Sequence, residues 1–265
     1  ALVLVILVLA RPKTTNKWQN SEIEGIDIML AIDVSTSMLA EDLKPNRLEA
    51  AKDVAAEFIN GRPNDNIGIT LFAGETFTQC PLTVDHAVLL DMIHNIKCGL
   101  ITDGTAVGMG IANAVTRLKD SKAKSKVIIL LTDGTNNKGD ISPMTAAEIA
   151  KSFGIRVYTI GVGTNGMAPY PYPVGNTVQY VSMPVEIDEK TLTEIAGTTD
   201  GNYFRATSNS KLKEVYEEID KLEKTKLNVK EYSKRDEEYH WFALAAFLCV
   251  LLEVLLRNSV LKKIP

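Results

Sequence analysis

The chain has 265 residues, of which 45% are hydrophobic and 23% are charged, and its formal net charge is −4. This composition is typical of a globular protein with room for one large domain or two small ones, and it argues against nucleic-acid binding, which needs a clustered basic surface. The three cysteines, Cys80, Cys98 and Cys249, form no CxxC pair and no Cys/His cluster, so no disulfide framework is expected. We expect Cys80 and Cys98 to be buried free thiols, with a disulfide between them as the alternative.

The first ten residues, "ALVLVILVLA", are apolar and are followed by Arg11 and Pro12. A helix of ten residues covers about 15 Å, half of the roughly 30 Å hydrocarbon core of a bilayer. We interpret residues 1–11 as the C-terminal part of a transmembrane helix and residues 12–23 as a linker. A signal-peptide hydrophobic region, which a charged leader would precede, is the alternative.

Between residues 24 and 222, apolar runs of strand length alternate with segments whose apolar residues have helical spacing. The first run, "GIDIMLAID", is typical of a strand buried on both faces of a parallel sheet. The segment "SPMTAAEIAKSFG" predicts a helix with Ser142 as its N-cap, Pro143 at its start and Gly154 beyond its end, and Asp85 is expected to cap another helix. Strands are expected at residues 25–33, 66–74, 78–83, 125–134, 155–163 and 202–206, and helices at residues 47–61, 85–96, 106–121, 142–154, 186–201 and 208–225. This alternation predicts a doubly wound α/β domain with a mostly parallel central sheet and helices on both faces.

Residues 164–185 are rich in Pro, Gly and Tyr and are too many for an ordinary connection. We expect a small hairpin or a surface loop that contacts a partner, with a variable decoration as the alternative. Residues 223–238 are highly charged and are interpreted as a linker. Residues 239–261 are mostly apolar, and a helix of that length reaches about 34 Å. We therefore expect a second transmembrane helix there, with a buried helix of a soluble core as the alternative.

Three segments place oxygen-bearing side chains after a predicted strand or before a predicted helix: "DVSTS" from Asp33, "TDG" around Asp133, and "TDGT" ending at Thr105. In an open α/β sheet, ligands bind beyond the carboxyl ends of the strands, where the strand order reverses. Hydroxyls and carboxylates with no thiolate or imidazole nearby suit a hard cation such as Mg²⁺. The candidate ligands are Asp33, Ser35, Ser37, Thr105 and Asp133. The alternative is that the hydroxyls only cap helices, although one oxygen side chain is enough for a cap.

The "DVSTS" stretch is the Asp-x-Ser-x-Ser motif of the von Willebrand factor A domain, and "DGT" and "TDG" resemble that family's threonine loop and distal aspartate. Together they resemble a metal-ion-dependent adhesion site. The resemblance implies that Ser35 and Ser37 ligate the ion through their hydroxyls, and that Thr105 ligates it directly in one state. It implies that Asp33 and Asp133 hold the ion directly or through water. One coordination position then accepts an Asp or Glu carboxylate from a partner protein, so that Mg²⁺, with Mn²⁺ or Ca²⁺ as alternatives, serves recognition rather than catalysis.

A single such domain between membrane segments, with "FAGETFTQCPLT", "DGTAVGMGIANAVTRLKDS" and a C-terminal "LLRNSVLKKIP", resembles the bacterial Bat aerotolerance proteins, in particular their BatA-like member. The resemblance implies a complex with other Bat-type proteins in the bacterial inner membrane. It also implies a functional link to a MoxR-type AAA+ ATPase and to stress or oxygen tolerance. The α/β domain is then expected in the periplasm, although a count of positive charges beside the two anchors favours the cytoplasm.

The alternative function is an Mg²⁺-dependent hydrolase or phosphotransferase with Asp33 as nucleophile or base. Phosphatases of that type need a second carboxylate two residues on, where this chain has Ser35, and the sequence contains neither a GxxxxGK[ST] loop nor a G-x-S-x-G elbow. We therefore predict that the protein is not an enzyme. Gly108 and Gly110 are expected to permit close helix packing rather than to bind phosphate. Because Asp33 is expected to be a surface carboxylate, we expect Asp33→Ala to leave the fold intact.

Overall fold

The computed structural model describes residues 25–164, 166–175 and 177–231, and five isolated positions: Phe247, Leu248, Leu251, Val254 and Leu255. The chain divides into two compact units, one of which is residues 23–225, while the other takes in both ends of the chain. The fold described below is that of the first unit.

The two predicted membrane segments, residues 1–11 and 239–261, lie outside the described residues apart from the five isolated positions. The linker at residues 12–23 also lies outside them. In the part of the chain that the structure describes, no helix is both long and apolar enough to cross a bilayer. The charged segment 223–238 is helical as far as Glu231, so its first part continues the last helix of the domain.

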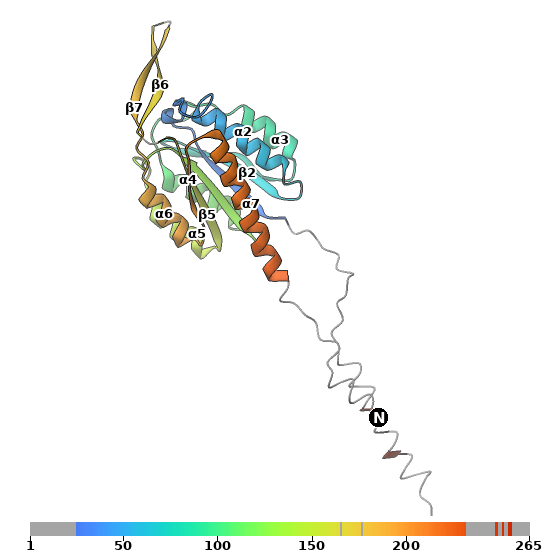
Figure 1. Cartoon of the computed structure of the whole chain (residues 1–265). Helices are drawn as coiled ribbons and strands as arrows, with labels where there is room; N and C mark the ends of the chain where they lie inside the picture. Colours follow the sequence, from blue (N-terminus) through green and yellow to red (C-terminus); the bar gives the residue numbers. More distant parts are fainter. Residues whose placement is uncertain are drawn as a thin grey trace, which may run out of the picture. The chain divides into compact units, whose positions relative to one another are not determined.

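A six-stranded sheet forms the centre of the domain, in the order β3-β2-β1-β4-β5-β8 (Figure 1). Neighbouring strands are parallel except β2 and β3, so the predicted mostly parallel α/β sheet is confirmed. The strand order reverses at β1 and β4, whose carboxyl ends therefore lie side by side, and this is where open α/β sheets bind ligands. The strands are β1 (Asp27–Asp33), β2 (Asn66–Phe72), β3 (Thr76–Thr83), β4 (Lys126–Thr132), β5 (Ile155–Val162) and β8 (Tyr203–Ala206).

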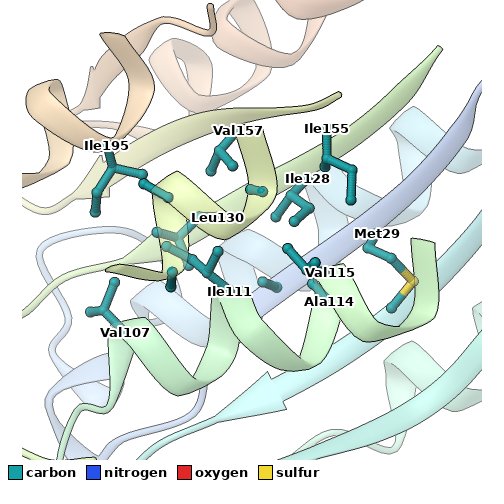
Figure 2. Packing of buried hydrophobic residues seen from close by; sticks show 14 of the residues in the cluster. Met29, Val107, Ile111, Ala114, Val115, Ile128, Leu130, Ile155, Val157 and Ile195 are labelled. Carbon is teal, nitrogen blue, oxygen red and sulfur yellow. The ribbon is translucent and has the colours of Figure 1, made fainter. Parts of the chain in front are cut away.

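Helices cover both faces of this sheet, as the sequence predicts. They are α2 (Arg47–Asn60), α3 (His86–His94), α4 (Val107–Leu118), α5 (Pro143–Ser152), α6 (Glu189–Thr198) and α7 (Asn209–Glu231), with a short 3-10 turn, η1 (Thr36–Leu39), after β1. On one face, Ile111 and Ala114 of α4 pack with Ile128 and Leu130 of β4, and side chains from α5 and α6 complete the cluster (Figure 2). Each fully buried Ile or Leu side chain of this cluster stabilises the fold by about 1.5–3 kcal/mol.

The opposite face of the sheet is buried as well. Ile28, Leu30 and Ile32 of β1 alternate with the residues of the first cluster and are at most 1% exposed. On the helices α2 and α7, the rings of Phe58 and Tyr216 contact each other with centroids 4.9 Å apart. The run "GIDIMLAID" therefore has the two-sided burial expected of a central parallel strand.

Helix starts follow the predicted capping chemistry. The Asp85 carboxylate accepts a hydrogen bond from the Val88 N–H, and the Ser142 hydroxyl accepts one from Thr145 N–H with Pro143 as the first helical residue. Each such cap satisfies a backbone donor that the first helical turn leaves unpaired. Both predicted caps are confirmed.

The two glycines of α4 are needed for close packing, as predicted. A Cβ on Gly108 would lie 2.1 Å from the backbone oxygen of Ile141, and one on Gly110 would lie 2.8 Å from the ring of Phe72. No larger residue fits either position without moving backbone or a buried ring. The helix can therefore approach both the sheet and the loop before α5.

Cys80 and Cys98 are free thiols, so the disulfide alternative is excluded. Cys80 is buried on β3, whereas Cys98 is partly exposed, which corrects the expectation that both are buried. Burial, together with the negative charges of Asp33 and Asp133, raises the pKa of Cys98 to about 12. The Cys98 thiol is therefore protonated and unreactive at neutral pH.

The unusual segment at residues 164–185 is a hairpin, as one of the two alternatives predicted. Strands β6 (Met167–Val174) and β7 (Thr177–Pro184) pair antiparallel and form a separate two-stranded sheet. In Figure 1 this hairpin extends away from the layers around the main sheet. At its base, the carbonyl oxygen of Pro169 accepts a hydrogen bond from the N–H of Glu41, just after η1.

Candidate metal centre

Asp33 ends strand β1 and is completely buried. One of its carboxylate oxygens accepts a hydrogen bond from Ser35 N–H (2.9 Å), and the other accepts one from the Thr132 hydroxyl at the end of β4 (2.6 Å). The expectation that Asp33 is a surface carboxylate is therefore wrong. The sequence position after a strand indicates the carboxyl edge of the sheet, but η1 and the neighbouring strand end bury this edge.

The hydroxyls of Ser35 and Ser37 form a continuous hydrogen-bonded path toward β4. The two oxygens are 2.9 Å apart, and the Ser37 hydroxyl donates to Asp133 Oδ1 at 2.7 Å. Ser35 is the N-cap residue of η1, yet its side chain makes no capping hydrogen bond. The capping alternative therefore does not account for these two serines.

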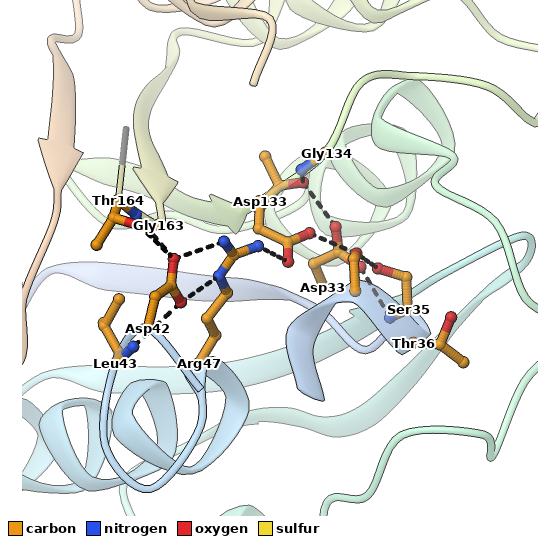
Figure 3. Close-up of polar contacts among 12 residues, drawn as sticks. Asp33, Ser35, Thr36, Asp42, Leu43, Arg47, Asp133, Gly134, Gly163 and Thr164 are labelled. Carbon is orange, nitrogen blue, oxygen red and sulfur yellow. Dashed lines mark hydrogen bonds and ion pairs between the residues drawn. The ribbon is translucent and has the colours of Figure 1, made fainter. Parts of the chain in front are cut away.

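Asp133 follows β4 and is held between two donors. Its Oδ2 accepts a hydrogen bond and ion pair from Arg47 Nη1 at 2.6 Å, while Ser37 bonds Oδ1. The same guanidinium contacts both oxygens of Asp42, through Nε at 2.8 Å and Nη2 at 2.6 Å. Figure 3 shows this row of charged groups, Asp42, Arg47 and Asp133, with Asp33 and Ser35 beyond it.

Thr105 reaches the site on the loop before α4, and Asn137 fixes that loop. Asn137 accepts from Thr105 N–H through its side-chain oxygen (2.9 Å) and donates its own N–H to the Thr105 carbonyl (3.0 Å). The Thr105 hydroxyl lies beside Gly134, where a Cβ would be 3.3 Å from its oxygen. Within the described residues, no hydrogen bond joins the Thr105 side chain to the other four candidate ligands.

A second contact ties the Thr105 loop to η1. Asp103 accepts hydrogen bonds from the N–H and the hydroxyl of Thr36, at 3.0 and 2.9 Å. Burial alone would raise the pKa of Asp103, but these bonds lower it overall. Asp103 is thus an ionised tether between two of the three oxygen-rich segments.

The electrostatics of the site are those of buried carboxylates with too little positive charge. Burial, reinforced by repulsion from Asp133, raises the pKa of Asp33 to about 7. Burial also raises the pKa of Asp133, although Arg47 opposes it. Asp42 behaves differently, because the hydrogen bonds from Arg47 outweigh its burial and bring its pKa down to about 2.

The donor set fits a hard divalent cation. Among the described residues, no group of three or more His, Cys, Asp and Glu side chains is placed to hold a metal ion, so this centre would be of another kind, with two carboxylates supplemented by hydroxyls. Arg47 balances Asp133, whereas the Asp33 carboxylate accepts hydrogen bonds from two neutral groups, the Ser35 N–H and the Thr132 hydroxyl. A cation held by these oxygens would supply the positive charge that Asp33 lacks.

Three residues that shape this site are absent from the sequence-based prediction: Arg47, Asp42 and Asn137. Arg47 carried a usable signal, because it is the first residue of a helix, where the positive end of the helix dipole disfavours a cation. An arginine at that position indicates an anionic partner outside the helix. Asp42 and Asn137 lie in loops with no pattern that distinguishes them from ordinary polar loop residues.

Comparison with known families identifies a match over most of the chain. The von Willebrand factor type A domain matches residues 27–218. This range begins at the first residue of β1 and ends within α7. It contains all five candidate ligands.

Several solved structures share this fold. The chain is 32% identical to an aerotolerance-related membrane protein from Bacteroides fragilis (TM-score 0.66; 74% of this chain and 98% of that chain). It is 34% identical to the conserved hypothetical protein BatB from Bacteroides thetaiotaomicron (TM-score 0.66; 76% and 100%). It is 25% identical to proximal thread matrix protein 1 from the mussel byssus, with a zinc-occupied MIDAS motif (TM-score 0.59; 75% and 45%). The chain therefore spans less than half of the mussel protein but nearly all of the two bacterial structures.

Proposed function

Because the chain belongs to the von Willebrand factor type A domain family, we propose that it is a recognition module that binds a partner protein through a divalent cation. One observation carries the proposal. Asp33, Ser35, Ser37 and Asp133 come from two different strand ends and meet at the point where the strand order reverses. The Asp33 carboxylate accepts a hydrogen bond from the Ser35 N–H (2.9 Å), and the hydroxyls of Ser35 and Ser37 lead to the Asp133 carboxylate through hydrogen bonds of 2.9 and 2.7 Å. Thr105 is the fifth candidate ligand and lies on the adjoining loop.

Oxygen ligands decide which ion the site would prefer. Zinc in proteins favours imidazole and thiolate ligands, whereas Mg²⁺, Mn²⁺ and Ca²⁺ favour carboxylates and hydroxyls. The zinc-occupied MIDAS motif of the mussel protein supports a divalent cation at this place in the fold. We expect Mg²⁺ at the site of this chain, with Mn²⁺ or Ca²⁺ as alternatives.

The partner is expected to contribute a carboxylate. Serine and threonine hydroxyls are neutral, so an ion held largely by them retains positive charge and attracts an external Asp or Glu. When the ion binds this carboxylate, no covalent bond of the partner is made or broken. The module therefore acts by binding and not by catalysis.

The similarity to BatB and to the aerotolerance-related membrane protein suggests the setting of this binding. We propose that the module works in the bacterial inner membrane, anchored by residues 1–11 and 239–261, with its α/β domain in the periplasm. Its partners there would be other Bat-type proteins, with a functional link to a MoxR-type AAA+ ATPase and to stress or oxygen tolerance.

The alternative, a Mg²⁺-dependent hydrolase with Asp33 as nucleophile, has less support. Asp33 is fully buried, and both of its oxygens already accept hydrogen bonds, from Ser35 and Thr132. A nucleophile must be within reach of the substrate, and a side chain that is 0% exposed is not. Asp33 is instead arranged to hold charge in a fixed position.

Thermal unfolding of the full chain with EDTA or with millimolar Mg²⁺, Mn²⁺ or Ca²⁺ tests the metal site. A ligand at 100 times its Kd stabilises the native state by about 2.7 kcal/mol, which corresponds to a rise in Tm of roughly 5–10 °C for a domain of this size. We expect this rise in the wild type and its loss in Ser37→Ala, which removes one candidate ligand.

Thr36→Val is the matched control, because Thr36 lies between the two serines but bonds Asp103 instead. It should keep the metal-dependent rise. If no ion raises the Tm of the wild type, or if Ser37→Ala responds as the wild type does, the metal assignment is wrong.

A further inference from the structure

The β6–β7 hairpin presents an uncharged and exposed surface. None of the residues from Met167 to Pro184 carries a charged side chain, and every residue of β7 is exposed. The large exposed side chains on it are Met167, Tyr172, Val178, Tyr180, Val181 and Met183. Charge normally keeps exposed strands from pairing with other chains, and this hairpin has none.

The register of the hairpin determines which backbone groups face outward. The strands end at Val174 and resume at Thr177, and at the other end the N–H of Val185 bonds the carbonyl of Gly166 (2.8 Å). In an antiparallel pair, hydrogen-bonded and non-bonded positions alternate. The pairs Pro169–Ser182, Pro171–Tyr180 and Pro173–Val178 therefore turn their backbone groups away from the ladder. The bond from Glu41 to the Pro169 carbonyl, which comes from outside the hairpin, agrees with this assignment.

The two edges of the hairpin differ as a result. On β6 three of the four outward positions are prolines, which have no N–H, so Met167 at the base is the one outward donor that this edge has for another strand. On β7 the outward positions Val178, Tyr180 and Ser182 each have an N–H and a carbonyl. Among the described strands, β7 pairs with β6 alone. We call the proline-rich edge of β6 the blocked edge, and we call the edge of β7, whose backbone groups can pair with another strand, the open edge.

We propose that the open edge of β7 pairs antiparallel with the same edge of a second copy of this chain, about a two-fold axis at Tyr180. In this register Tyr180 lies opposite Tyr180 of the second copy, and Val178 lies opposite Ser182, so all three N–H groups find acceptors. Because residues 167–184 carry no charge, the side chains of the hairpin meet those of a second copy without like-charge repulsion. The resulting four-stranded sheet has a proline-blocked edge on each side, so that assembly stops at the dimer.

The dimer contact is linked to the candidate metal centre but does not use its ligands. Glu41, whose N–H bonds Pro169, also interacts with the Tyr180 hydroxyl through its carboxylate, and this interaction raises the pKa of Tyr180. Glu41 follows η1, the turn that contains Ser37. Pairing would therefore bring two candidate metal centres into one assembly, and removal of the pairing should leave each centre intact.

Proline substitution on the open edge tests the pairing. In Val178→Pro the outward N–H is lost while the ladder with β6 is kept, whereas Val178→Ala shortens the side chain and keeps the N–H. In sedimentation equilibrium of the full chain, we expect the wild type and Val178→Ala to approach twice the 29.0 kDa chain mass and Val178→Pro to stay at the chain mass. The concentration should run from about 1 to about 100 μM, because contacts below the standard interface size are weak.

A wild type that stays monomeric over that range, or a Val178→Pro variant that dimerises equally well, would overturn the proposal. So would a β7 edge that binds only an unrelated protein. The metal-dependent rise in Tm should persist in Val178→Pro, which shows that the variant is folded. Dimerisation and metal binding are therefore separate readouts, and either can fail without the other.

Cross-linking tests the register. Opposed residues at a hydrogen-bonded antiparallel position have Cα atoms about 5.5 Å apart, within the range of a disulfide. Tyr180→Cys in the full chain should therefore form a covalent dimer under mild oxidation. Tyr172→Cys is the matched control, because Tyr172 is about equally exposed (58% against 60%) but lies on the blocked strand. Equal cross-linking of both variants, or of the wild type with its own cysteines, would indicate random collision and refute the proposed register.

Discussion

At the residue scale, Arg47 determines how much charge the candidate metal centre has to balance. Its guanidinium lies between Asp42 and Asp133, within 2.6–2.8 Å of their carboxylate oxygens. When Asp33, Asp42 and Asp133 are ionised, three negative charges face one positive charge, which leaves a net charge of −2. A buried charge is stable only when it is paired. A divalent cation is the species whose charge completes this balance.

The pair formed by Asp42 and Arg47 predicts a specific acid sensitivity. The pKa of Asp42 in the folded protein is about 2, below the value of about 3.9 for an unfolded aspartate. A lowered folded-state pKa contributes stability above pH 4, and this contribution is lost as the pH falls from about 4 to about 2. The free energy of unfolding should therefore differ most between wild type and Asp42→Asn at neutral pH, and the difference should shrink below pH 4.

Urea unfolding at several pH values between 2 and 7, in EDTA, measures this difference. Asp42→Asn keeps the shape of the side chain but removes its charge, so the comparison isolates the ion pair with Arg47. A difference that stays constant down to pH 2 would contradict the assignment of a low pKa to Asp42.

At the element scale, the packing of helices α4 and α6 predicts opposite effects on stability for two Gly→Ala substitutions. At Gly108 a Cβ would lie 2.1 Å from a backbone oxygen, while at Gly197 in α6 a Cβ meets no atom within 4 Å. Gly108→Ala should destabilise the domain by about 1–3 kcal/mol or prevent folding, because backbone has to move. Gly197→Ala should stabilise it by about 0.4–1 kcal/mol through the lower entropy of the unfolded chain.

Urea denaturation at neutral pH measures the free energy of unfolding of both variants. Because both replace Gly by Ala, each variant is the control for the other. A neutral effect of Gly108→Ala would mean that the helix has room at this position, and that Gly108 is there for another reason.

The helices and strands of this domain could be predicted because local signals agree with the tertiary structure. β1 and β4 are uninterrupted apolar runs, and α5 has Ser142 and Pro143 at its start. The candidate ligands could be named because they follow such strands at fixed spacing. The burial of Asp33 could not be predicted from the sequence, because it depends on Thr132, which comes from a strand about a hundred residues away. The edge asymmetry of the hairpin likewise requires the strand register.

At the scale of the whole molecule, the candidate metal centre and the β6–β7 hairpin are separate parts of the domain that are joined by a few contacts. Thr164 bonds Asp42 through its N–H and hydroxyl, and Glu41 bonds Pro169. Replacement of residues 167–184 by a short Gly/Ser linker keeps Thr164 and all five candidate ligands. We expect this deletion to keep the metal-dependent rise in Tm, because none of the removed residues supplies a ligand, and to abolish dimerisation.

Ser37→Ala is the reciprocal variant, because it removes a candidate ligand and leaves the hairpin unchanged. It should lose the metal-dependent rise in Tm while sedimenting as the wild type does. If the deletion loses only dimerisation and Ser37→Ala loses only the metal-dependent rise in Tm, recognition through the metal and assembly through β7 are independent. If the deletion also removes the metal response, the contacts of Glu41 and Asp42 with the hairpin position the metal loop, and the two parts act as one.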